Sequence, residues 1–350
     1  MNSEFIQAIY DLEKEKGIEA EVLFEAIENA LIVGFKKNFN ANTNVRVSLD
    51  RETGDLHVYS QRTIVEQVND PELEISLEDA QHKSKKYELG EIFENEVTPK
   101  NFGRIAAQTA KQVIVQRIRE AERDVSFTQY AGKEGEIANA VVAKVDNRGV
   151  IVNLGKVEAL LLPQEQLPNE TYKLGERVKC YINKVEKAFK GPQIFVSRTH
   201  PNLVKKLFEL EVPEIYEGII EIKSVSREAG SRSKIAVYSK MENIDPVGSS
   251  VGPRGSRVQN IIDELNGEKI DIIEWSEEPA QFIASSLNPS EVLAVDVNEE
   301  EKTAMVVVPD DQLSLAIGKE GQNVRLAARL TGFRIDIKSE SQIKNEILEL

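Results

Sequence analysis

The chain is poor in the residues that form covalent or metal cross-links. Its 350 residues include a single cysteine, Cys180, which excludes an internal disulfide framework and a cysteine-based zinc site. The three histidines, His57, His82 and His200, show neither His-x-x-x-His spacing nor an obvious set of carboxylate partners. The sequence therefore predicts neither a bound metal nor a cofactor.

Long apolar runs are missing as well. No stretch approaches the roughly 18 consecutive apolar residues that a membrane-spanning helix requires. The N-terminus, MNSEFIQAIYDLEKEKG, is amphipathic and charged and lacks the apolar centre of a secretory signal. We expect a cytoplasmic protein without membrane contact. Because a Gly-x-x-x-x-Gly-Lys-Ser/Thr phosphate loop is also absent, we predict no nucleotide hydrolysis and no catalytic residues.

Acidic residues outnumber basic residues by 59 to 44, a net charge of −15, which excludes a polybasic protein that coats nucleic acid indiscriminately. The charge is unevenly distributed. Residues 131–200 contain 11 basic and 8 acidic residues, a net of +3, whereas residues 1–130 carry −8 and residues 201–350 carry −10. Any nucleic acid should therefore meet the middle segment and local basic clusters elsewhere. The length and the 41% apolar content predict two to four globular domains.

Residues 1–130 are predicted to form a mixed α and β domain. Apolar residues at 3–4 spacing indicate a helix that ends at Gly17 and a second helix over residues 23–35. Alternating valines and leucines on either side of residues 52–55 indicate a β-hairpin. A long helix is expected after Pro99. Nothing in this segment is typical of a catalytic site.

In residues 131–200 the apolar residues alternate with a period of two, as in β-strands. Short runs of valine, isoleucine and leucine are separated by turn residues, and five such strands in about seventy residues predict a small closed barrel of the OB type. The barrel is either a purely structural β domain or a nucleic-acid-binding domain, and we favour the second. Its aromatic residues are few: Tyr172, Tyr181, Phe189 and Phe195.

Because base stacking needs aromatic side chains, we expect electrostatic contacts between the barrel and nucleic acid. The basic candidates are Lys144, Arg148, Lys184, Lys187, Lys190 and Arg198. For Lys187 and Lys190 an ordinary solvated surface is an equally good interpretation.

The C-terminal segment contains an internal repeat. Residues 251–258 read VGPRGSRV and residues 317–324 read IGKEGQNV, an offset of 66 residues. Each copy has the pattern helix, strand, strand, helix, Gly-x-x-Gly, helix, strand. Residues 201–277 and 278–350 are therefore predicted to be two copies of one αββααβ domain.

The Gly-x-x-Gly tetrapeptides are the candidate binding sites. Two residues without a Cβ let the backbone turn sharply and approach a phosphate chain, and the following helix offers its N-terminus to the phosphates. The predicted contacts are Gly252, Pro253, Arg254, Gly255 and Arg257 in the first copy and Gly318, Lys319, Glu320, Gly321 and Arg325 in the second. A third match, residues 132–135, leads into a strand and is interpreted as a turn. Two tight structural turns are the alternative interpretation.

The order of these segments resembles the NusA family of bacterial transcription elongation factors. The resemblance covers essentially the whole chain and is most specific in VGPRGSRVQNIIDELNGEKIDII and AIGKEGQNVRLAARLTGFRIDI. It implies an α+β multidomain protein with an N-terminal RNA-polymerase-binding domain (1–130), an S1-type OB-fold barrel (131–200), and two tandem type II KH domains (201–277 and 278–350). Arg198 matches the arginine that ends the last barrel strand in the family.

The resemblance also implies partners and a function. These are RNA polymerase, single-stranded nascent RNA and other Nus-type factors, and we expect the chain to act as a monomer. The implied function is modulation of transcriptional pausing, intrinsic termination and antitermination, without catalysis. The alternatives are an RNA-processing protein that joins KH and OB modules, or a ribosome-associated RNA-binding protein. Module order argues against a phosphorolytic RNA-degrading enzyme, because the barrel precedes the KH pair and no large catalytic core remains.

Overall fold

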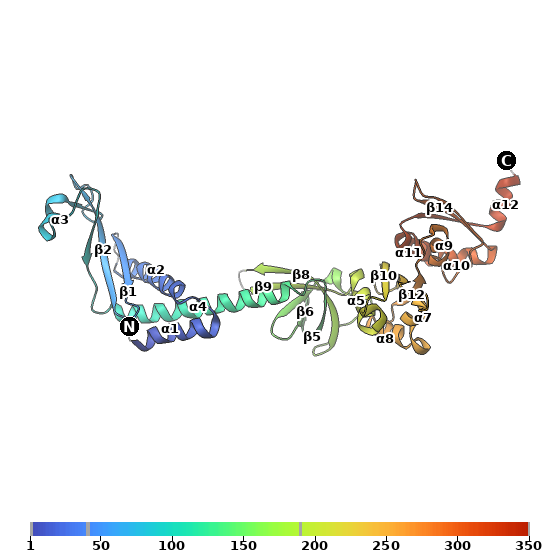
Figure 1. Ribbon diagram of the computed structural model, residues 1–350, viewed down its shortest axis with the longest axis horizontal. Helices are drawn as coiled ribbons and strands as arrows, with labels where there is room; N and C mark the ends of the chain where they lie inside the picture. The colour runs from blue at the N-terminus through green and yellow to red at the C-terminus, as the bar shows by residue number, and fades with distance from the viewer. Residues whose placement is uncertain (1–2, 40–42, 189–190, 349–350) are drawn as a thin grey trace. The chain divides into compact units, whose positions relative to one another are not determined.

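The computed structural model describes residues 3–39, 43–188 and 191–348 (Figure 1). The chain forms two compact units, residues 1–126 and residues 127–350. Within the described ranges, no helix combines the length and the apolar character needed to cross a membrane.

The first unit combines helices with a small mixed sheet. Its elements are α1 (Ser3–Lys16), α2 (Ala20–Phe39), β1 (Asn44–Leu49), β2 (Leu56–Val65), β3 (Glu74–Ser76), α3 (Leu77–Lys83), β4 (Ile92–Glu96) and α4 (Phe102–Ala131). The predicted hairpin is confirmed, with Val47 opposite Val58 in the antiparallel β1–β2 pair. Strand β2 also pairs with β3 and β4.

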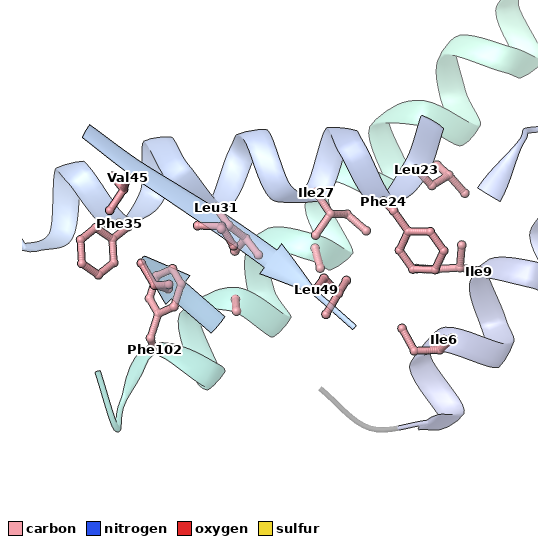
Figure 2. Packing of buried hydrophobic residues seen from close by; sticks show 14 of the residues in the cluster. Ile6, Ile9, Leu23, Phe24, Ile27, Leu31, Phe35, Val45, Leu49 and Phe102 are labelled. Carbon is pink, nitrogen blue, oxygen red and sulfur yellow. The ribbon is translucent and has the colours of Figure 1, made fainter. Parts of the chain in front are cut away.

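The core of this unit lies between α1, α2, the start of α4 and strand β1 (Figure 2). Phe24 and Leu31 lie on one face of α2, and Phe102 begins a stripe at 3–4 spacing on α4 that continues with Ala106 and Ala110; all five are fully buried. A smaller cluster of Ile64, Ala80 and Phe93 stabilises the β2, α3 and β4 region.

The barrel predicted for the middle segment is present. Strands β5 (Ile137–Asp146), β6 (Gly149–Asn153), β7 (Glu158–Leu161), β8 (Arg177–Ala188) and β9 (Gly191–Ser197) close in the order β5-β6-β7-β9-β8. Alternate residues point inward, as Ala140 and Val142 do on β5. The third Gly-x-x-Gly string, residues 132–135, forms a turn between α4 and β5, as predicted.

Each repeat copy forms the predicted αββααβ domain. The first contains α5 (Pro201–Glu211), a short α6 (Pro213–Tyr216), β10 (Ile220–Glu228), β11 (Arg232–Ser239), α7 (Pro246–Val251), α8 (Ser256–Glu264) and β12 (Lys269–Glu274). The second contains α9 (Pro279–Ser286), β13 (Ala294–Asn298), β14 (Thr303–Val308), α10 (Leu313–Ile317), α11 (Gln322–Thr331) and β15 (Arg334–Ser339), followed by α12 (Glu340–Leu348). In both sheets the first two strands are antiparallel and the third joins the second in parallel.

The single cysteine lies in the barrel core. Cys180 is fully buried, and burial raises the pKa of its thiol to about 12. Because the thiolate is the reactive form, we expect Cys180 of the folded protein not to react with a thiol reagent at pH 8. One equivalent should react after denaturation with guanidinium. Rapid reaction of the native chain would contradict this placement.

Candidate nucleic-acid interface

The two Gly-x-x-Gly loops, residues 252–255 and 318–321, have the same backbone conformation. Gly252 has φ 78° and ψ 173°, and Gly318 has φ 77° and ψ 172°. The third residue of each loop is left-handed although it is not glycine, with φ 54° at Arg254 and φ 53° at Glu320. A non-glycine residue adopts this conformation rarely, so its occurrence at both equivalent positions indicates a shared local requirement.

The first glycine of each loop is required by close packing. A Cβ on Gly252 would lie 2.5 Å from Cγ of Arg257, and a Cβ on Gly318 would lie 2.8 Å from the backbone nitrogen of Asn323. Both glycines thus let the loop approach the first turn of the next helix. The last glycine of each loop meets no such obstacle and supplies only its positive φ.

The helices after the loops begin without a side-chain cap. Gly255 is the N-cap of α8 and Gly321 is the N-cap of α11, and neither glycine can supply a capping side chain. The positive end of each helix dipole is therefore not neutralised by a capping oxygen. An anion beside the loop can therefore interact with the positive N-terminal end of the helix.

The side chains at the two loop tips are exposed but differ in charge. The first tip carries Pro253 and Arg254, and the second carries Lys319 and Glu320. The first tip is thus a cation with no acidic neighbour in the tetrapeptide. In the second, the carboxylate of Glu320 offsets the ammonium of Lys319.

The arginine that follows the first loop contacts protein groups. Nη1 of Arg257 donates to Oε2 of Glu214 at 2.9 Å and to the carbonyl oxygen of Ser249 at 2.6 Å. These bonds connect α8 to α6 and α7. The expected contact of Arg257 with phosphate stays a prediction. Within the described residues, its guanidinium links the helices next to the loop.

Arg325, after the second loop, also contacts protein groups, but its carboxylate partner lies in the other repeat copy. Its guanidinium contacts the carboxylate of Glu228 through Nε and Nη2, and Nη1 donates to the carbonyl oxygen of Glu320 at 3.0 Å. Glu228 belongs to the first KH-like domain, so this contact crosses between the two repeat copies.

The basic candidates on the barrel do not form one group. Lys144 and Arg148 flank the β5–β6 turn and both pair with Asp146, at 3.1 and 3.5 Å. The backbone N–H of Arg148, followed by the Lys144 ammonium, lowers the pKa of Asp146. Lys184 pairs with Glu186 at 2.6 Å and lies beyond the opposite end of β5. All three are exposed, whereas Lys190 and Phe189 lie outside the described residues.

The prediction that Arg198 contacts nucleic acid is wrong. Its side chain is 1% exposed, because it is enclosed between the barrel and α8. Nε and Nη2 donate to the two carboxylate oxygens of Glu170, both at 2.7 Å. Nη1 donates to the carbonyl oxygen of Lys179 at 2.7 Å and to Oε1 of Glu264 at 3.0 Å. Arg198 therefore joins the barrel to the first repeat copy and is inaccessible to RNA.

Two aromatic side chains of the barrel also contact other protein groups. Tyr181 is buried and stacks on His200 with ring centroids 4.4 Å apart, and Tyr172 donates to Glu170 at 2.7 Å. Trp275 of the first repeat copy packs against Phe282 of the second, with ring centroids 6.5 Å apart.

The acidic residues that hold the loop arginines were not foreseen from the sequence. Glu214 and Glu228 precede their partners by 43 and 97 residues, and no local pattern distinguishes them from solvated glutamates.

Known families match the chain along nearly its whole length. The matches are the NusA N-terminal domain at residues 4–124, the S1 RNA binding domain at 132–197, the NusA-like first KH domain at 198–275 and the NusA-like second KH domain at 279–345. The transcription termination/antitermination protein NusA of Halalkalibacterium halodurans is 60% identical over 342 residues, covering 98% of this chain and 90% of that protein. This chain belongs to the NusA family.

Two further NusA proteins extend the comparison. The NusA of Bacillus subtilis is 58% identical, over 98% of this chain and 93% of that protein. The solution structure of the N-terminal domain of B. subtilis NusA is 57% identical, with a TM-score of 0.33, and covers 35% of this chain and 99% of that domain. The predicted fold class, an N-terminal NusA domain followed by an S1 barrel and two KH domains, is confirmed. As a NusA protein, the chain is a transcription termination/antitermination factor with S1 and KH RNA-binding domains.

One string in this NusA sequence matches the Gly-x-Ser-x-Gly pattern of serine hydrolases, at residues 248–252. Its Ser250 is buried inside α7 and donates to the carbonyl oxygen of Pro246 at 2.7 Å. A nucleophile elbow instead exposes the serine on a turn between a strand and a helix. Ser250 does not fit that role.

Proposed function

We propose that this NusA protein holds single-stranded nascent RNA on the two Gly-x-x-Gly loops while residues 1–130 bind RNA polymerase. The observation that carries this proposal is the pair of exposed loops with one shared backbone conformation, each leading into a helix without a side-chain cap. Backbone N–H groups and a positive helix end suit a phosphate chain of any sequence. The exposed barrel cations Lys144, Arg148 and Lys184 supply further phosphate contacts.

The physical advantage is a high local concentration of RNA. Each loop offers few charges, and the chain as a whole is acidic, so each RNA contact is weak by itself. Attachment to polymerase keeps the loops beside the emerging strand, and the second binding event becomes intramolecular. The protein then modulates pausing, intrinsic termination and antitermination as a monomer, together with other Nus-type factors.

The test is site-specific photocrosslinking in a stalled elongation complex. Benzoylphenylalanine replaces Pro253 or Lys319 in the loops, or Val33, which is 67% exposed on α2 of the first unit. We expect the loop positions to crosslink nascent RNA and position 33 to crosslink polymerase. Leu210, 60% exposed on α5, is the control for non-specific labelling. Loop crosslinks to ribosomal RNA in a lysate, with none to transcripts in the complex, would overturn the proposal.

A further inference from the structure

Glu228 occupies a special position between the two KH domains. It is the last residue of β10 in the first domain. Its carboxylate contacts three side chains of α11 in the second domain. Arg325 donates from Nε at 2.6 Å and Gln322 donates from Nε2 at 2.8 Å, while Nη1 of Arg329 lies 3.8 Å away. Residues 322, 325 and 329 share one helix face.

The contacts continue into the second loop. Gln322 follows the loop directly, and its amide also donates to Oγ of Ser231 in the first domain at 2.8 Å. The guanidinium of Arg325 bridges the carboxylate of Glu228 and the carbonyl oxygen of Glu320, the left-handed residue of the loop. The backbone of the second loop is therefore connected to the first domain through two links.

The first loop lacks this arrangement. By the 66-residue offset, Gln259 corresponds to Arg325. Its amide donates to Asp263 within α8, at 2.8 Å. The Gly-x-x-Gly conformation thus forms at residues 252–255 without an equivalent arginine, so Arg325 and Glu228 are not needed to build such a loop.

Hydrogen bonds from Arg325, and then from Gln322, lower the pKa of Glu228 although the carboxylate is partly buried. Glu228 is therefore ionised at neutral pH.

The two KH domains are also held together by contacts that do not involve Glu228. Ala236, Ile273, Phe282 and Leu330 form an apolar cluster between them, and Lys234 donates to the carbonyl oxygen of Asn288 at 2.9 Å. Loss of one ion pair should leave the two domains docked.

We propose that Glu228 is a positioning residue that sets the spacing between the two RNA-binding loops. This inference rests on the proposed function. An RNA strand that contacts both loops gains affinity from the second contact only when the distance between the loops matches the length that the RNA spans. Glu228 maintains that distance by holding Arg325, and through it the carbonyl of Glu320, against the first domain.

The test compares the full-length protein with Glu228→Gln for binding of two RNAs by fluorescence anisotropy. One RNA has about four nucleotides, enough for one loop, and the other is about five times as long. We expect the ratio of the long-RNA to the short-RNA affinity to fall about tenfold in the variant. Simple electrostatics predicts a different result, because removal of a carboxylate should raise the affinity for both RNAs and leave their ratio unchanged.

Two further variants complete the design. Glu221→Gln removes another carboxylate of β10, one that pairs with Lys223 and Lys240 away from α11, and should leave the ratio unchanged. Arg325→Lys keeps the charge but loses the bidentate geometry, so it should lower the ratio as Glu228→Gln does. An unchanged ratio in both Glu228→Gln and Arg325→Lys would overturn the proposal. Absence of RNA binding by the unaltered protein would instead refute the proposed function.

Discussion

Replacing Arg198 by alanine is expected to lower the free energy of unfolding of residues 127–350 by about 3–5 kcal/mol, the range for removal of one partner from a buried ion pair. The guanidinium bonds both oxygens of Glu170, Oε1 of Glu264 and two backbone carbonyl groups. Without it, the mostly buried carboxylate of Glu170 loses its only cationic partner among the ion pairs of the described residues, and Glu264 keeps only its pair with Lys179 at 3.4 Å. Urea denaturation, followed by circular dichroism and by the reactivity of Cys180, measures the change.

Two variants make that result specific. Arg198→Lys retains a charge but lacks the planar fork of donors. Its loss of unfolding free energy should therefore lie between zero and that of Arg198→Ala. Arg148→Ala removes an arginine whose side chain is 82% exposed and should change the stability by less than about 0.5 kcal/mol. A loss for Arg198→Ala no larger than that of Arg148→Ala would contradict the assigned role.

Arg198 also marks the limit of what the sequence could predict. The closed barrel follows from the alternation of valine and isoleucine with turn residues, whereas the place of Arg198 after the last barrel strand was implied by the family resemblance. Its partners Glu170 and Glu264 lie 28 and 66 residues away, and they meet it only because the barrel packs on α8. Local patterns contain no information about such a pairing, so the sequence alone predicts a surface contact for a basic residue in a basic segment.

The Gly-x-x-Gly loops represent the opposite case. Their conformation is a local property, because a positive φ and a close approach to the next helix turn select glycine at defined positions. The internal repeat then allowed each copy to support the interpretation of the other. What escaped prediction was again long-range, since the partners of Arg257 and Arg325 lie in elements remote in sequence.

The loops supply the second large prediction, which concerns RNA affinity. Changing Pro253 and Arg254 to aspartate, or Lys319 and Glu320 to aspartate, places two carboxylates against the phosphates. Each charged hydrogen bond is worth about 1.5–3 kcal/mol, so we expect either variant to lose about tenfold or more in affinity. The first loop changes from one positive charge to two negative charges, whereas the second starts near neutral, so the first variant should lose more.

The fold should tolerate both changes, because aspartate adopts the left-handed conformation of the third loop position more readily than most residues. Thermal unfolding checks this, and anisotropy titrations at several salt concentrations measure the affinity and its salt dependence. The chain contains its own control in the turn at residues 132–135, where Lys133→Asp makes the same charge change as Lys319→Asp in a tetrapeptide that leads into a strand. If Lys133→Asp weakens RNA binding as much as the loop variants do, the loops have no special role and only the overall charge of the protein matters.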